Sequence, residues 1–241
     1  MHFISEVYWN RGERMSNQDT LSLQDVGIGK KRIVFSLICD GMGGLEEGEQ
    51  ASGYVAEQMT EWFYQEAVSM VKRHKNGKKL LYAGVRVLYE CNERMRVCAR
   101  ERKICFGTTI TALLLAGRRY YIWQSGDSAL YRIMSPAAGK ERMKRLTKGH
   151  STDRHTLTRC IGSFPWQRPD IRKGRLLIKR NTFLLCSDGF WQRMDEEQLK
   201  TVLNPRELIN QDRMGRRLAE IAKYVKRRGE ADNLSAVVIR T

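Results

Sequence analysis

Four aspartates stand at the ends of apolar runs, where they could share one site. Asp40 closes the run "SLIC", Asp188 closes "FLLCS", Asp127 follows "YYIWQSG" and Asp232 precedes "NLSAVVI". Aspartate and glycine are poor strand formers, so each of these positions indicates the end of a strand or a turn. A single Asp-Gly pair is ordinary turn chemistry, but four such ends would form a carboxylate cluster if the fold brought them together.

A cluster of carboxylates repels itself unless a cation neutralises it, and a site made only of oxygen ligands favours Mg²⁺ or Mn²⁺. Gly41, Gly43 and Gly44 follow Asp40 and allow close approach of the backbone, with carbonyl groups as further ligands. The acidic residues at 46, 47 and 49 instead favour the N-terminus of a following helix. The residues alone leave two interpretations open, a hard-metal site and a set of unrelated turns.

Apolar patterning predicts strands interrupted by an early pair of helices and followed by late helices. Strands are expected at 32–39, 108–116, 119–125, 129–134, 175–178, 182–187 and 233–240, and helices at 51–73, 79–103, 195–203 and from 213 onward. The short loop between the two early helices predicts an antiparallel pair. The glycines between the three strands from 108 to 134 predict a meander. The fold class is therefore α+β, with antiparallel sheets and helices packed outside.

The composition is that of a soluble globular protein. The chain has 241 residues, of which 41% are hydrophobic and 29% charged, with no internal repeat or Pro-rich linker. We therefore expect a single domain over residues 1–241. No apolar run is long enough for a membrane span, and the first residues lack the basic-then-apolar order of a signal peptide, so we expect a cytoplasmic protein without a membrane partner. The six cysteines lack CxxC spacing and favour free thiols.

Positive charge is concentrated after residue 66. Residues 1–66 hold five Lys and Arg against eleven Asp and Glu, a net of −6, whereas the remainder holds 38 against 16, a net of +22. A nucleic-acid-binding protein is one interpretation of such an excess. However, the basic residues are spread over several segments without interleaved aromatic residues or a nucleic-acid motif. The pattern favours a basic surface that attracts acidic partners, and nucleic acid is not the expected ligand.

Eight short motifs follow one another in an order that is typical of a known family. They are "RMSNQD" (14–19), "CDGMGGLEEGEQAS" (39–52), "FGTTITALLL" (106–115), "QSGDSALYR" (124–132), "LTKGHS" (146–151), "TLTRCIG" (156–162), "LLCSDGFW" (184–191) and "ADNLSAVVI" (231–239). Together they span nearly the whole chain. In this order they resemble the metal-dependent protein serine/threonine phosphatases of the 2C type (the PPM family). The resemblance implies a β-sandwich of two antiparallel sheets flanked by antiparallel helix pairs, in α-β-β-α layers, with metals at one end.

The resemblance also implies a set of metal ligands. Asp40 matches the carboxylate that bridges two Mn²⁺ or Mg²⁺ ions, and the Gly41 carbonyl matches a ligand of the first ion. Asp188 and Asp232 match the carboxylates of the second ion. Asp127, together with Asp188, matches a site for a third, weaker ion in bacterial relatives.

The implied reaction is hydrolysis of phosphoserine or phosphothreonine in a protein, by direct attack of a hydroxide that bridges the two metals. Arg14 matches the arginine that binds the phosphate, and Asp19 matches an acidic residue that orients metal-bound water. The expected partner is a phosphorylated protein, the product of a serine/threonine kinase, and the expected state is a monomer. The alternative is a non-catalytic module on the same fold that binds phosphoprotein. Retention of Arg14, Asp19 and the four aspartates favours the enzyme.

The sequence departs from the family pattern at several positions, and with methionine at position 42 it resembles a compact bacterial-type member with a truncated flap. Gln18 replaces a glutamate, and Met42 replaces a histidine proposed as general acid in some relatives. Ala129 replaces the arginine of Gly-Asp-Ser-Arg, and Gly149 replaces the aspartate of Asp-His-Ser, whose His150 we expect to be structural. The segment from Ser151 to 156 is too short for the family's usual flap beside the active site, which leaves the substrate open.

Overall fold

The computed structural model describes residues 3–29, 31–74, 76–136, 140–152, 156–176 and 180–241. The strands are β1 (Ile4–Asn10), β2 (Asp19–Ile28), β3 (Lys31–Met42), β4 (Gly107–Thr108), β5 (Ile110–Ala116), β6 (Arg119–Ser125), β7 (Ala129–Met134), β8 (Arg142–Arg145), β9 (Asp170–Arg175), β10 (Asn181–Cys186) and β11 (Leu234–Arg240). The helices are α1 (Leu45–Trp62), α2 (Val68–Lys72), α3 (Gly77–Arg102), α4 (Asp188–Trp191), α5 (Glu196–Val202) and α6 (Gln211–Arg227), and a π-helical turn over Phe63–Ala67 joins α1 to α2.

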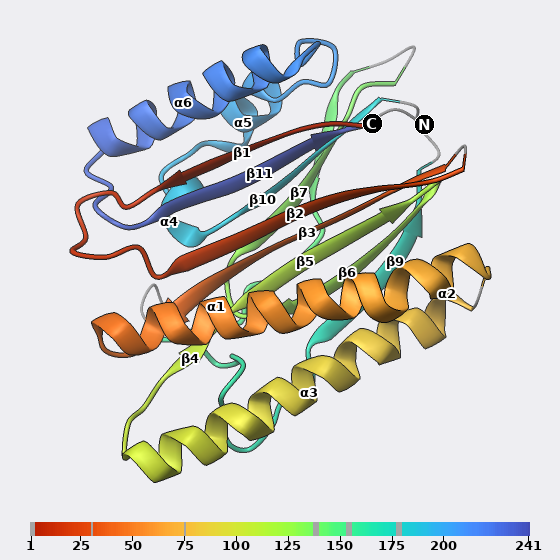
Figure 1. The fold of residues 1–241 in the computed structure, drawn as a ribbon. Helices are drawn as coiled ribbons and strands as arrows, with labels where there is room; N and C mark the ends of the chain where they lie inside the picture. Colours follow the sequence, from red (N-terminus) through yellow and green to blue (C-terminus); the bar gives the residue numbers. More distant parts are fainter. Residues whose placement is uncertain (1–2, 30, 75, 137–139, 153–155, 177–179) are drawn as a thin grey trace.

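The strands form two antiparallel sheets that pack face to face (Figure 1). The first sheet has the order β1-β11-β10-β7-β8, and the second has the order β2-β3-β5-β6-β9, with β4 paired to β3. The helices α5 and α6 lie over the outer face of the first sheet, while α1, α2 and α3 lie over the outer face of the second. The α+β class and the two antiparallel sheets expected from the sequence are confirmed.

Strand β3 shows why the central strands read as continuous apolar runs. Val34 and Ile38 point into the core between the two sheets, whereas Phe35 and Leu37 point into the core beneath α1 and α3. A strand that is buried on both faces needs apolar residues at every position. A third apolar cluster joins the first sheet to α5 and α6. The site described below lies at the end where this apolar alternation stops, at Asp40.

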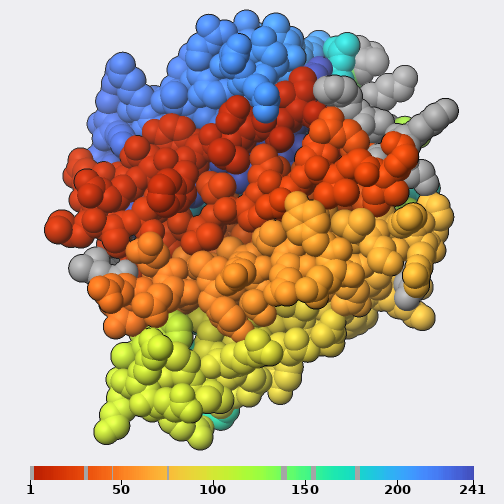
Figure 2. Space-filling view, viewed as in Figure 1, coloured from red at the N-terminus to blue at the C-terminus, as the bar shows by residue number. Residues whose placement is uncertain are grey.

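The helices agree with the sequence pattern, although α1 begins at Leu45 rather than at 51. Figure 1 shows α1 and α3 side by side and antiparallel, as expected for the early pair. In the space-filling view, the N-terminal strands form a band between α6 and α1 (Figure 2). Among the described residues, no helix combines the length and apolar character needed to cross a membrane. All six cysteines are free thiols.

The predicted meander from 108 to 134 is wrong. Strands β5 and β6 pair as expected, but β7 crosses to the other sheet, where it pairs with β10 and β8. The crossing occurs at Gly126, whose φ of +107° is one that other residues rarely adopt, and a Cβ there would lie 2.5 Å from Thr109. The turn that carries Asp127 is therefore a link between the sheets.

The strand expected at 175–178 is also misplaced. In its place, β9 runs from Asp170 to Arg175 beside β6, so the strand ends where it was expected to begin. Residues 177–179, which include the second half of the expected strand, lie outside the described residues. The charged, half-exposed residues of β9 gave no apolar signal because this strand lies at the sheet edge.

Candidate metal centre

Five aspartates meet at one end of the sandwich. Asp19 opens β2 and is the direct cross-strand partner of Asp40 near the end of β3. Asp188 begins α4 immediately after β10, Asp232 precedes β11, and Asp127 lies in the turn before β7. The structure thus brings together all the carboxylates that the sequence singled out, from both sheets.

The backbone of Asp40 is clamped by two threonines. Its N–H donates to Thr109 Oγ1 at 2.9 Å, and its carbonyl accepts from the Thr109 N–H at 2.8 Å and from Thr108 Oγ1 at 3.0 Å. The next residue, Gly41, is buried and donates its N–H to the Gln18 carbonyl at 3.1 Å. A Cβ on Gly41 would lie 2.0 Å from the Gly48 carbonyl oxygen, so this bend requires glycine. Thr108 and Thr109, the two threonines of "FGTT", are therefore positioning residues. The sequence pattern alone assigned them no role.

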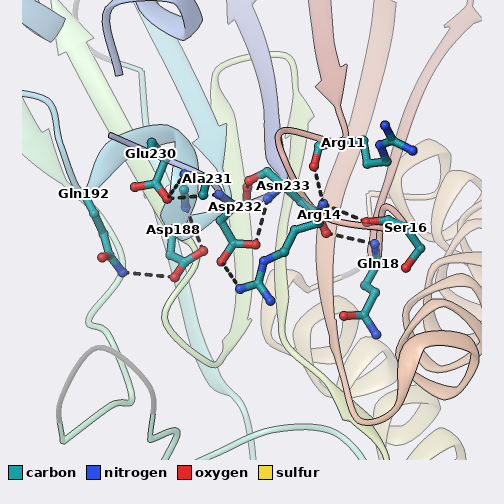
Figure 3. A network of polar contacts seen from close by, with 12 residues as sticks. Arg11, Arg14, Ser16, Gln18, Asp188, Gln192, Glu230, Ala231, Asp232 and Asn233 are labelled. Atoms are coloured by element: carbon teal, nitrogen blue, oxygen red, sulfur yellow. Dashed lines mark hydrogen bonds and ion pairs between the residues drawn. The ribbon is translucent and has the colours of Figure 1, made fainter. Parts of the chain in front are cut away.

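Asp188 and Asp232 lie next to each other with their carboxylates partly engaged (Figure 3). Asp188 Oδ1 accepts from the Gly189 N–H at 2.7 Å, and Oδ2 accepts from Gln192 Nε2 at 3.0 Å. Asp232 Oδ1 accepts from the Asn233 N–H at 2.7 Å, and Oδ2 pairs with Arg14 Nη2 at 2.9 Å. Each carboxylate keeps lone pairs available, since an ionised carboxylate has about four acceptor positions.

Arg14 sits on a loop that Asn233 holds against the cluster. Asn233 donates through Nδ2 to the carbonyls of Arg11 and Ser16, and its Oδ1 accepts from the Gln18 N–H (Figure 3). The Asn233 side chain therefore fixes the backbone of this loop through three hydrogen bonds. Arg14 itself is 59% exposed, so its guanidinium faces both Asp232 and the solvent. The ion pair with Asp232 raises the pKa of Arg14 further.

Burial and mutual repulsion raise the pKa values of Asp19, Asp40, Asp127 and Asp188. The pKa of Asp19 rises to about 6 and that of Asp188 to about 7, chiefly through burial and then through the neighbouring aspartates. The pKa values of Asp40 and Asp127 are raised for the same first reason. In addition, Asp19 Oδ2 is buried without a hydrogen-bond partner. A site with only oxygen donors and excess negative charge fits a hard divalent cation.

The carboxylates are close neighbours but do not converge on one point. Among the described residues, no three His, Cys, Asp or Glu side chains lie in an arrangement that could hold a metal ion. The contacts give a reason, because Asp232 turns toward Arg14 and Asp188 turns toward its own helix. A cation bound here would have to compete with these contacts of Asp232 and Asp188.

The raised pKa values predict how stability depends on pH. The folded chain binds more protons than the unfolded chain, whose aspartates titrate near 3.8, so folding is favoured less as the pH rises from about 4 to 7. We expect the metal-free protein to melt several degrees higher at about pH 5.5 than at about pH 8, since 1 kcal/mol moves the melting temperature by about 2–4 °C. Excess Mn²⁺ should remove most of this difference. Calorimetry at both pH values, with and without Mn²⁺, measures this difference. Equal melting temperatures of the metal-free protein at the two pH values would contradict the raised pKa values of the aspartates.

His150 holds the turn that carries Asp127. Its Nδ1 accepts from the Gly126 N–H at 3.2 Å, and its Nε2 lies 3.3 Å from Asp170 Oδ2. Both ring nitrogens are thus engaged in the fold, in agreement with the structural role expected for this buried histidine, and burial lowers its pKa.

The short segment predicted in place of a flap includes residues 153–155, which lie outside the described residues. Ser151 and Leu157, on either side of them in the chain, form an isolated antiparallel β-bridge.

Comparison with known proteins places this fold. No protein-family model matches the sequence, and no curated protein matches it. The structure is similar over nearly its whole length to that of the S. agalactiae serine/threonine phosphatase (TM-score 0.81, 18% identity, 99% of each chain). It is also similar to PppA, a key regulatory component of T6SS in Pseudomonas aeruginosa (TM-score 0.77, 23% identity, 99% of this chain and 97% of that one).

A third similar structure is the Mycobacterium tuberculosis phosphatase PstP (TM-score 0.76, 22% identity, 98% of this chain and 97% of that one). The catalytic domain of PstP has been solved with two manganese ions. The chain therefore has the fold of the bacterial serine/threonine phosphatases.

Proposed function

We propose that this chain is a metal-dependent protein phosphatase that hydrolyses phosphoserine and phosphothreonine in cytoplasmic proteins phosphorylated by a serine/threonine kinase. Residues 1–241 would act as one monomeric domain. One observation carries the proposal. Five aspartates from both sheets meet beside an exposed arginine, Arg14, at one end of a fold shared with phosphatases.

The residues present suit two divalent ions. Asp40 and the Gly41 carbonyl would hold the first ion. Asp40, Asp188 and Asp232 would hold the second. Asp127 and Asp188 would hold a third, more weakly bound ion. When bound, such ions supply a water of lowered pKa and neutralise charge on the phosphoryl oxygens. The raised pKa values of Asp40 and Asp188 support this assignment, because a cation relieves the repulsion that causes part of them.

The chain's own groups bind and orient the reactants. Arg14 carries a planar fork of donors that fits two phosphoryl oxygens at once, and more than half of its side chain is open to a substrate. Asp19 lies opposite Asp40 with one oxygen unpartnered, so it can accept a hydrogen bond from the attacking water and orient it. The Thr108 and Thr109 clamp keeps Asp40 in place during this step.

Hydrolysis is expected to require an added divalent cation. Phosphate release from a phosphothreonine peptide should appear with Mn²⁺ or Mg²⁺ and disappear with excess chelator, because the carboxylates alone supply neither an activated water nor charge neutralisation. Phosphate release and the melting temperature should both rise over the same range of Mn²⁺ concentration. A binding-only module would retain the phosphopeptide in the presence of Mn²⁺ without releasing phosphate. Full activity in excess chelator would rule out the proposal.

A further inference from the structure

A pocket of about 410 Å³ adjoins the candidate metal centre on the side of Asp127. Its walls include Asp127, Arg145, Gly149, Ser151, Trp191 and Gln192. Gln192 also donates to Asp188, so the pocket and the carboxylate cluster share a wall. Any group bound here would lie beside a phosphoryl group held at the centre.

Arg145 is the only cation among the described residues that line this pocket, and its guanidinium is held in place. It stacks on the Trp191 ring at 4.2 Å from the ring centroid, and its Nη2 donates to the Asp127 carbonyl at 3.2 Å. Its Nε has no hydrogen-bond partner, and none of the described carboxylates forms an ion pair with it. An arginine fixed on an aromatic ring loses little conformational entropy when it binds an anion.

A glycine keeps this arginine available. Gly149 leaves room beside it, since a Cβ built there would lie 3.6 Å from Arg145 Nη2, at ordinary contact distance. An aspartate at this position would lie close enough to pair with Arg145 and satisfy it internally.

The surface next to the Arg145 pocket is also positively charged. Residues 146–148, which lie between Arg145 and Gly149 in the chain, line a second pocket of about 350 Å³ together with Arg168 and Arg172, among others. Asp170, the one acidic residue among the described residues that line this second pocket, is already paired with Arg159 at 3.0 Å. These side chains extend the positive potential along the surface that leads to the candidate centre, so an anionic chain is attracted there.

We propose that the Arg145 pocket binds an anionic group, a carboxylate or a second phosphoryl, next to the scissile phosphoresidue of the substrate. The proposal rests on the proposed function and names a substrate class for it, acidic or multiply phosphorylated protein segments. Asp127 also lines the pocket and carries the opposite charge, which a cation bound at the candidate metal centre would offset. A charge-assisted hydrogen bond contributes about 1.5–3 kcal/mol, which corresponds to at least about a tenfold preference.

The test compares phosphothreonine peptides with neutral, acidic and phosphoserine-containing neighbours, assayed with Mn²⁺. We expect kcat/KM for one or both anionic peptides to exceed that of the neutral peptide by about tenfold or more. The two anionic arms distinguish the carboxylate source from the phosphoryl source. Arg145→Gln should bring the ratio close to one, and Arg145→Lys should keep part of it. Equal kcat/KM for all three peptides in the wild type would overturn the proposal.

Gly149 provides a matched pair of variants that leaves Arg145 and its stacking partner unchanged. The carboxylate introduced by Gly149→Asp should pair with Arg145 and abolish the preference, whereas Gly149→Asn, of the same size, should keep it. If Arg145 served only to support Trp191, Arg145→Gln would lower kcat for every peptide by one factor and leave the ratio intact, which would overturn the proposal.

Failure of the proposed function gives a different result. In that case, neither the peptides nor p-nitrophenyl phosphate would release phosphate with Mn²⁺. The same comparison would then be made on dissociation constants of labelled peptides, where equal affinities of the wild type for neutral and anionic peptides would overturn the pocket assignment.

Discussion

Asp40→Asn is expected to abolish phosphopeptide hydrolysis while the fold stays intact. The substitution keeps the size of the side chain and the backbone bonds to Thr108 and Thr109, but removes the charge that would hold two cations. Loss of a group that acts on the transition state costs at least about 10²–10³-fold in kcat. Because burial and four neighbouring aspartates oppose ionisation of Asp40, its neutralisation should raise the melting temperature of the metal-free protein at neutral pH.

Asp127→Asn is the matched control for this experiment. It removes a carboxylate from the same cluster, but one assigned to a weaker third ion, so turnover should slow while binding of two Mn²⁺ ions remains measurable. Calorimetric titration with Mn²⁺ and steady-state kinetics on both variants decide between the assignments. Unchanged stoichiometry together with unchanged activity in Asp40→Asn would remove Asp40 from the site.

The strands that could be predicted from the sequence are those buried on both faces. The apolar runs of β3, β5, β10 and β11 are continuous because each of these strands packs on both a sheet and a helix layer. Strand β2 was not assigned, although Leu21 and Leu23 alternate with Ser22 and Gln24 in the manner of a half-buried strand. Strand β8 has four residues, three of them charged, and offers no apolar signal at all.

The chemistry of the candidate site could be predicted from residue types, but its assembly could not. Asp-Gly pairs at strand ends are visible in the sequence, whereas the pairing of Asp19 with Asp40 depends on the register of β2 and β3. The ion pair between Arg14 and Asp232 joins residues 218 positions apart. Local patterns carry no information on such contacts; the family resemblance implied that these residues share one site, but not these two contacts. Where the resemblance was silent, as for Arg145, the structure was needed.

Arg14→Ala is expected to raise KM for a phosphopeptide by about ten- to hundredfold, the equivalent of one charge-assisted, two-pronged contact. Arg14→Lys should fall between this variant and the wild type, because an ammonium group cannot bind two oxygens in the geometry of the guanidinium. Affinity for Mn²⁺ should stay the same or increase, since loss of Arg14 releases Asp232 from its ion pair. Kinetics at saturating Mn²⁺ and calorimetric metal titration measure the two effects separately.

Arg11→Ala is the control for the Arg14 variants. Arg11 is exposed on the same loop, and the contact that it makes with Asn233 uses its backbone carbonyl, which the substitution preserves. A general effect of positive charge near the site would raise KM in both alanine variants, whereas a specific phosphate ligand raises it in Arg14→Ala alone. If Arg14→Ala keeps the wild-type KM and kcat, Arg14 does not bind the phosphate, and the match of "RMSNQD" to the family motif must be abandoned.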